Sequence, residues 1–230
     1  MTLYLNRATL RPEAERDILA AVLATGDVAG GSGHKLIWAL HTDGPDRERD
    51  FLWRDAGSGT YFTLSRRPPE AGQRLFTVQS REMNLPVQRG SRLRFTLRAN
   101  PVSAEPAPPK GSGGPRRGRR HDIVTKTLLP QRGAEPGTID YDAVALAAAR
   151  DWMERRGRDA GFSLTKDFVV EGRDWVSIRR RRQRPIEIGV MDLAGVLELT
   201  DPEVFMQALG AGFGRSKAFG YGLMMVRPAE

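Results

Sequence analysis

The chain has 230 residues, 40% of them hydrophobic, with a formal net charge of +8 at pH 7 and a sequence pI near 10.4. Its length can bury a substantial core and suits one large domain or two small ones. The lack of cysteine excludes disulfides and thiolate metal sites. No apolar run reaches the roughly 18 residues of a membrane-spanning helix, and the N-terminus lacks a secretion-signal pattern. We therefore expect a soluble cytoplasmic protein.

The first part of the chain, residues 1–102, is predicted to be mostly β-strand. Residues 2–9 alternate apolar and polar side chains, and residues 11–25 have the apolar spacing of an amphipathic helix. A glycine-rich loop then leads to a short helical segment at 34–41. The later strands are predicted as a hairpin over 49–67 around a Gly-Ser-Gly turn, then 73–83 and 91–102. This order fits a ferredoxin-like domain whose second helix is short or degraded.

Residues 103–122 are rich in Pro, Gly and Arg and almost free of large apolar residues. Such a composition is typical of a mobile linker or surface loop. Four arginines make this segment basic: Arg116, Arg117, Arg119 and Arg120. Lys126 follows shortly afterwards, and we count it among the expected nucleic-acid contacts.

Residues 123–230 are predicted to form the second domain. A helix is expected over 140–162, because Ala145, Ala149, Trp152 and Met153 recur on one face. Alternating residues over 163–200 predict at least two long strands. A short helix at 201–209 has Asp201 as its N-cap, and a last strand is expected at 222–228. We interpret the whole as an α+β chain of two tandem ferredoxin-like (RRM-like) βαββαβ domains.

Arginine dominates the basic residues: five of the 36 are lysine, which leaves 31 arginines. The guanidinium group binds phosphate through two hydrogen bonds and stacks on bases. A GC-rich genome is an alternative reason for the arginine-to-lysine ratio, but it does not account for the clustering of the arginines. Clustered arginines in a chain of this charge favour a nucleic-acid partner.

The stretch "GAGFGRSKAFGYGLMMV", residues 210–226, raises the question of a phosphate site. It lacks the Gly-Lys-Ser/Thr order of a Walker A loop, and Arg215 stands where the dinucleotide fingerprint needs a glycine. It also connects a helix to a strand, the reverse of both motifs, so no nucleotide cofactor is expected. A flexible turn is the simpler interpretation. We favour contact with a nucleic-acid phosphate through Gly212, Gly214, Arg215, Ser216 and Lys217.

A second basic cluster, "SIRRRRQRPIEI", covers residues 177–188. Its cations are Arg179, Arg180, Arg181, Arg182 and Arg184. On one continuous strand they would make both faces basic, so we expect the run to span a hairpin tip that projects into solvent. A solvated charge run is the ordinary interpretation. Together with the other basic segments, it favours RNA, whose A-form helix is recognised largely through phosphates and shape.

His34 is the candidate acid–base residue. It follows a Gly-Gly-Ser-Gly run and begins a predicted helix, where the positive end of the dipole disfavours the imidazolium form. A lone histidine is more often structural, so the residues alone leave both roles open. His41 and His121 are scattered and do not complete a ligand set, and no metal or cofactor is expected.

Three segments resemble the CasE family of CRISPR RNA-processing endoribonucleases from the type I-E Cascade complex. They are "HKLIWAL" (34–40), "RLRFTLRANP" (92–101) and "GFGRSKAFGYGLM" (212–224). "WMERRGRDAGFSL" (152–164) is also similar to the family. The segments occur in the family's order and extend over most of the chain, and the first and third are the more specific.

The resemblance implies two ferredoxin-like domains and binding of a CRISPR repeat hairpin. It implies metal-independent cleavage at the 3′ base of the stem, with a 2′,3′-cyclic phosphate and a 5′-hydroxyl as products. The mature guide RNA would then stay bound within Cascade. The family's catalytic histidine falls on His34, beside the cation Lys35. Some members carry tyrosine where this chain has Gly31, so the second acid–base group is unassigned. A non-catalytic RNA-binding subunit of the same complex is the alternative.

Overall fold

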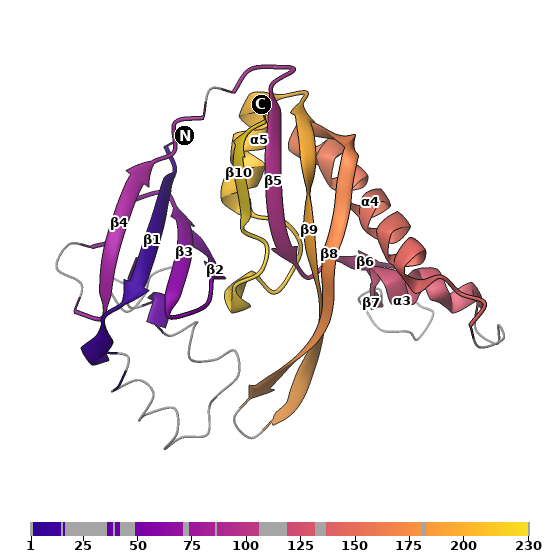
Figure 1. The fold of residues 1–230 in the computed structure, drawn as a ribbon, viewed down its shortest axis with the longest axis horizontal. Helices are drawn as coiled ribbons and strands as arrows, with labels where there is room; N and C mark the ends of the chain where they lie inside the picture. The colour runs from indigo at the N-terminus through magenta and orange to yellow at the C-terminus, as the bar shows by residue number, and fades with distance from the viewer. Residues whose placement is uncertain are drawn as a thin grey trace, which may run out of the picture.

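The computed structural model describes residues 2–14, 16, 36–38, 40–41, 49–70, 74–85, 87–105, 119–131, 137–180 and 183–229. They form two four-stranded antiparallel sheets (Figure 1). The helices α4 and α5 cover one face of the second sheet. This arrangement is the predicted α+β architecture.

The first sheet has the strand order β2-β3-β1-β4. Its strands are β1 (Tyr4–Leu10), β2 (Phe51–Asp55), β3 (Thr60–Ser65) and β4 (Phe76–Glu82). The predicted hairpin is confirmed, since β2 and β3 pair around Gly57, Ser58 and Gly59, all at positive φ. No helix occurs in the described residues between β3 and β4, as expected for a degraded second helix.

The first sheet packs on a helical segment that includes residues 36–38, 40 and 41. Ile37 and Leu40 are fully buried against Phe51 and Trp53. His41 is buried too: its Nε2 lies 3.1 Å from the Thr63 hydroxyl, and its ring stacks on Phe51. His41 is therefore a core residue. Of the predicted helix 11–25, the described residues 12–14 and 16 are helical.

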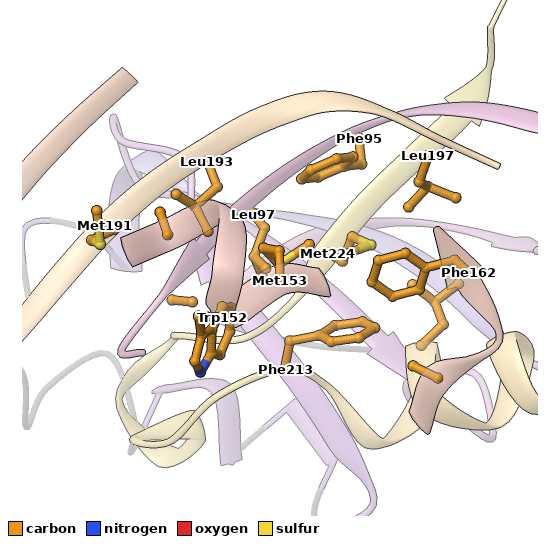
Figure 2. Close-up of a cluster of buried hydrophobic side chains, with 14 of the residues drawn as sticks. Phe95, Leu97, Trp152, Met153, Phe162, Met191, Leu193, Leu197, Phe213 and Met224 are labelled. Atoms are coloured by element: carbon orange, nitrogen blue, oxygen red, sulfur yellow. The ribbon is translucent and has the colours of Figure 1, made fainter. Parts of the chain in front are cut away.

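The second sheet has the order β10-β5-β9-β8. Its strands are β5 (Arg92–Ala99), β8 (Phe162–Arg180), β9 (Gln183–Leu199) and β10 (Met224–Pro228). Helix α4 (Tyr141–Ala160) joins β5 to β8, and α5 (Pro202–Ala211) joins β9 to β10. The predicted face of α4 is confirmed: Ala149, Trp152 and Met153 are buried against this sheet (Figure 2).

The assignment of residues 91–102 to the first domain was wrong. β5 pairs with β9 and β10, and Leu93, Phe95 and Leu97 are each 1% exposed in the second core. The division between the sheets thus falls between β4 and β5, not after residue 102. Alternation correctly predicted a half-buried strand, but alternation does not specify which strand is its neighbour. With β5 as its first strand, the second half is a complete βαββαβ unit.

The expected linker over 103–122 lies inside the second half. β6 (Val102–Ala104) and β7 (Arg120–Asp122) pair antiparallel, and the Glu105 N–H donates to the Arg119 carbonyl at 2.8 Å. The short helices α3 (Ile123–Leu128) and η1 (Leu129–Gln131) then lead toward α4. Because both ends of the segment are tied together, it is an insertion between β5 and α4 and not a connection between the domains.

One of the buried apolar clusters spans both halves of the chain. Leu3, Leu52 and Leu64 of the first half belong to the same buried cluster as the second sheet and α4. The Trp53 indole Nε1 donates to the Ala218 carbonyl at 3.1 Å. Buried apolar contact of this kind fixes the orientation of one half against the other.

The N-terminus of α5 carries a stability prediction. Asp201 Oδ1 accepts hydrogen bonds from the backbone N–H groups of Glu203 and Val204, both at 3.1 Å. Asp201→Ala should lower the free energy of unfolding by about 1 kcal/mol in chemical denaturation. Asp159→Ala, which removes an exposed helical carboxylate that caps nothing, should change it by less than about 0.5 kcal/mol. Equal losses would contradict the capping role.

Candidate nucleic-acid interface

The segment that connects α5 to β10, here called the glycine loop (residues 212–223), is held by backbone hydrogen bonds. The Phe213 N–H donates to the Gly222 carbonyl at 2.9 Å, and the Gly222 N–H donates to the Arg98 carbonyl at 2.8 Å. The Arg215 N–H donates to the Asn100 carbonyl at 3.1 Å. The loop is thus tied to the end of β5 and is not a free turn.

The glycines of this loop permit close packing against protein atoms. Gly222 has φ +91°, and a Cβ there would lie 2.4 Å from the Phe213 carbonyl oxygen. A Cβ at Gly212 would lie 2.7 Å from Leu52 of the first sheet, and one at Gly214 would lie 2.9 Å from the Asn100 oxygen. Such distances exclude a side chain. These contacts explain why glycine occupies these positions. That the glycines also contact a phosphate stays a prediction.

Asn100 positions the glycine loop, a role that the sequence did not indicate. Its side chain is buried, and its Nδ2 donates to the Gly189 carbonyl at 2.7 Å. Its Oδ1 accepts from the Ser216 hydroxyl at 3.1 Å. Ser216 itself has a positive φ of 57°. One amide therefore links β5, β9 and the residue between the two cations of the loop.

Those two cations have different surroundings. Arg215 is exposed, whereas Lys217 is half-buried and its Nζ donates to the Ala211 carbonyl at 2.7 Å. Burial lowers the pKa of Lys217 below its usual value, and the nearby guanidinium groups of Arg49 and Arg156 lower it further. Arg49 and Arg156 come from other parts of the chain, and no local pattern among the arginines singles them out.

The predicted basic hairpin is confirmed in its backbone. The β5–β9 pairing ends at Ala99 and Met191, but β8 and β9 stay paired to Arg180 and Gln183. The end of this hairpin projects beyond the sheet as a two-stranded ribbon (Figure 1). Arg179 and Arg180 lie on its β8 strand, Arg184 is exposed on β9, and Arg181 and Arg182 lie outside the described residues.

The base of the ribbon packs on the glycine loop. Ile178, Ile188 and Val190 form a buried cluster with Tyr221, and Phe219 packs against it. The structure therefore brings together two basic segments that lie about 30 residues apart in the chain. Arg184 of the ribbon and Arg215 of the glycine loop, both exposed, thus belong to one packed unit, which suits an extended charged ligand.

The remaining predicted residues are distributed as follows. Arg119 and Arg120 are exposed at β7, and Lys126 is exposed with its Nζ donating to the Ser103 hydroxyl at 2.8 Å. His121, expected in a linker, lies on β7 with Nε2 3.1 Å from Glu105 Oε1. His34, Lys35, Arg116 and Arg117 lie outside the described residues, so their roles stay predictions.

In the part of the chain that the structure describes, no helix is long and apolar enough to cross a membrane. The same residues hold no cluster of three or more His, Asp or Glu side chains that would suit a metal ion. The described residues do include a glycine loop hydrogen-bonded to the end of β5, a basic ribbon and exposed arginines. They define a candidate surface for an anionic polymer.

Comparison with known proteins identifies the family. A family model described as CRISPR associated protein matches residues 3–228, and the chain belongs to this family. The resemblance to CasE proteins is thereby confirmed. The CRISPR-associated endoribonuclease Cse3 of Thermus thermophilus is 30% identical over 152 aligned positions, and the match covers 60% of this chain and 57% of that protein.

Solved structures share the fold. One is a CRISPR endoribonuclease Cse3 bound to a 19-nucleotide RNA, with a TM-score of 0.67 and 22% identity over 99% of this chain and 100% of that one. Another is a chain of a CRISPR RNA-guided surveillance complex, with a TM-score of 0.61 and 19% identity over 98% and 100%. At these identities the likeness establishes the two-domain architecture.

Proposed function

We propose that this protein is an endoribonuclease that binds the hairpin of a CRISPR repeat and cleaves precursor CRISPR RNA at the 3′ base of the stem. The match of the family model across residues 3–228 carries the proposal. The names of the related proteins, an endoribonuclease and an RNA-bound endoribonuclease, support it. The net charge of +8 fits an RNA ligand.

The ribbon and the glycine loop are the proposed RNA-binding elements. Because the ribbon packs on Tyr221 and Phe219, the cations of both segments would keep a fixed spacing. A stem could then lie along the ribbon arginines while its backbone reaches Arg215 and Lys217. Contacts of this kind recognise shape and phosphates, which suits an A-form helix whose deep major groove hides its bases.

His34 is the proposed catalytic residue. The 2′-hydroxyl next to the cleaved bond attacks phosphorus, the P–O5′ bond breaks, and the products are a 2′,3′-cyclic phosphate and a 5′-hydroxyl. His34 would accept the 2′-hydroxyl proton or donate a proton to the leaving oxygen, and Lys35 would stabilise charge on phosphorus. An internal nucleophile needs alignment more than a metal. Gly31 leaves the second acid–base group unassigned.

After cleavage, the protein would retain the guide RNA and assemble with the other Cascade subunits in the cytoplasm. A chain of similar fold lies in a surveillance complex, which supports this placement. The second candidate function is a non-catalytic RNA-binding subunit, favoured by Gly31 in place of tyrosine. Incubation of repeat hairpin RNA with excess purified protein separates the two: the enzyme gives two fragments, and the binding subunit returns intact RNA.

Arg215 provides a test of the binding surface. Arg215→Ala should weaken hairpin binding and lower the slope of log affinity against log salt by about 1, because one phosphate contact is lost. The measurement is fluorescence anisotropy at several salt concentrations. Arg227→Ala, which removes an exposed arginine on β10, is the matched control. If Arg215→Ala and the control gave the same slope, the glycine loop would not be a phosphate contact.

A further inference from the structure

Two arginines from distant parts of the chain lie near Lys217, where the two halves of the chain meet. Lys217 belongs to the glycine loop, Arg156 lies on α4, and Arg49 comes just before β2 of the first sheet. Lys217 lies close enough to both arginines to feel their charge. β2 is in contact with the loop, since Leu52 meets Gly212 and Trp53 meets Gly220. The cluster therefore requires both halves.

These cations lack counter-ions within the described residues. No ion pair to a carboxylate involves Arg49, Arg156 or Lys217 there. Among the described residues, the Lys217 ammonium donates to the neutral Ala211 carbonyl alone, which leaves two of its three hydrogens for another acceptor. Arg49 and Lys217 are half-buried and Arg156 is exposed. Like charges close together in partly desolvated positions repel one another, and an anion bound between them would relieve that repulsion.

A buried donor lies beside the same cluster. Trp152 is 2% exposed, and its Nε1 has no hydrogen-bond partner among the described residues. The Arg156 guanidinium lies 5.7 Å from the centre of its ring. In Figure 2 the indole nitrogen lies at the end of the side chain that points away from the labelled core residues. An indole N–H in this position usually finds an acceptor.

We propose that Arg49, Arg156 and Lys217, with the Trp152 indole beside them, form a site for one phosphodiester group of the bound RNA. The site joins the first sheet, α4 and the glycine loop through a single anion, and it would lock the two halves together around the ligand. This inference rests on the proposed RNA-binding function and assigns Arg49 and Arg156 to it.

Single substitutions and matched RNAs test the site. Arg49→Gln and Arg156→Gln should each weaken hairpin binding by about 3- to 10-fold and reduce the salt slope by about 1. Arg158→Gln removes an exposed charge two residues along α4 and should change neither. If wild-type protein did not bind the hairpin, the proposed function would fail. If wild-type protein bound the hairpin and both Arg49→Gln and Arg156→Gln bound it equally well, only the proposed phosphate site would be contradicted.

Neutral methylphosphonates placed one at a time in the hairpin locate the phosphate. At one position the substitution should weaken binding to wild-type protein but cause no further loss with Arg49→Gln, because the partner is already gone. Losses that add at every position would overturn the assignment.

The lysine signals give a readout that does not depend on affinity. The chain has only five lysines, so isotope-labelled side chains can be assigned, with Lys217→Arg identifying Lys217. RNA at micromolar concentration should raise the pKa of Lys217, while the side-chain signal of exposed Lys166 should not move. An unchanged Lys217 would contradict the site. A shift of equal size with inorganic phosphate in place of RNA would assign the site to free phosphate and overturn the RNA assignment.

Discussion

His34→Ala is expected to bind the repeat hairpin with wild-type affinity and to cleave it at least about 100-fold more slowly, since a positioned acid–base group contributes roughly 10² to 10⁴ in rate. Cleavage is followed under single-turnover conditions, so that retained product does not mask the chemical step. Binding is measured with hairpin RNA that carries a 2′-deoxy nucleotide at the cleavage position and therefore lacks the nucleophile.

His121→Ala is the matched control for this variant. His121 lies on β7 beside Glu105, in the inserted segment, and its loss should leave cleavage unchanged. Added imidazole should restore part of the activity of His34→Ala, because it supplies the missing acid–base group. Unchanged cleavage by His34→Ala would remove His34 from the mechanism. Loss of binding together with cleavage would assign it a structural role instead.

Gly222→Ala should be the most destabilising change in the glycine loop. The position combines φ +91° with a Cβ that would lie 2.4 Å from a backbone oxygen. Gly57 also has a positive φ, +81°, but a Cβ there meets nothing within 4 Å. Gly57→Ala should therefore cost only the backbone strain of about 1 kcal/mol. We expect Gly222→Ala to lower the free energy of unfolding by about 2 kcal/mol more, the typical cost of overpacking.

Chemical denaturation of both variants measures that difference. If Gly222→Ala and Gly57→Ala lost equal stability, the close approach of the loop strands would not explain the glycine. RNA binding by the folded Gly222→Ala protein is the second readout. Because the glycine loop carries Arg215 and Lys217, its displacement should weaken the hairpin complex, whereas Gly57→Ala should bind normally.

The predictions that rested on local pattern were the most successful. Alternation and turn residues located the 49–67 hairpin, and helical spacing identified the buried face of α4 around Trp152 and Met153. The strand 91–102 was assigned to the wrong sheet, because its alternation describes which side is buried and not which strand lies beside it. The partner became clear only from pairing with β9, about 100 residues later.

The candidate site shows the same limit. Arg215 and Lys217 were proposed as site residues because glycines and cations cluster locally, and the projecting hairpin was predicted from its arginine run. Arg49, Arg156 and Asn100 had no such signal. Asn100 meets the glycine loop only through the tertiary structure, and Arg49 and Arg156 come near Lys217 only there. Residues assembled by tertiary contact have no shared spacing in the sequence.

The end groups of the cleaved RNA test the central proposal most directly. Repeat hairpin RNA is incubated with purified protein in EDTA, and the fragments are examined by mass spectrometry. Attack by the internal 2′-hydroxyl predicts an upstream fragment that ends in a 2′,3′-cyclic phosphate and a downstream fragment that begins with a 5′-hydroxyl. A 5′-phosphate on the downstream fragment, or intact RNA at excess protein, would contradict the proposed endoribonuclease.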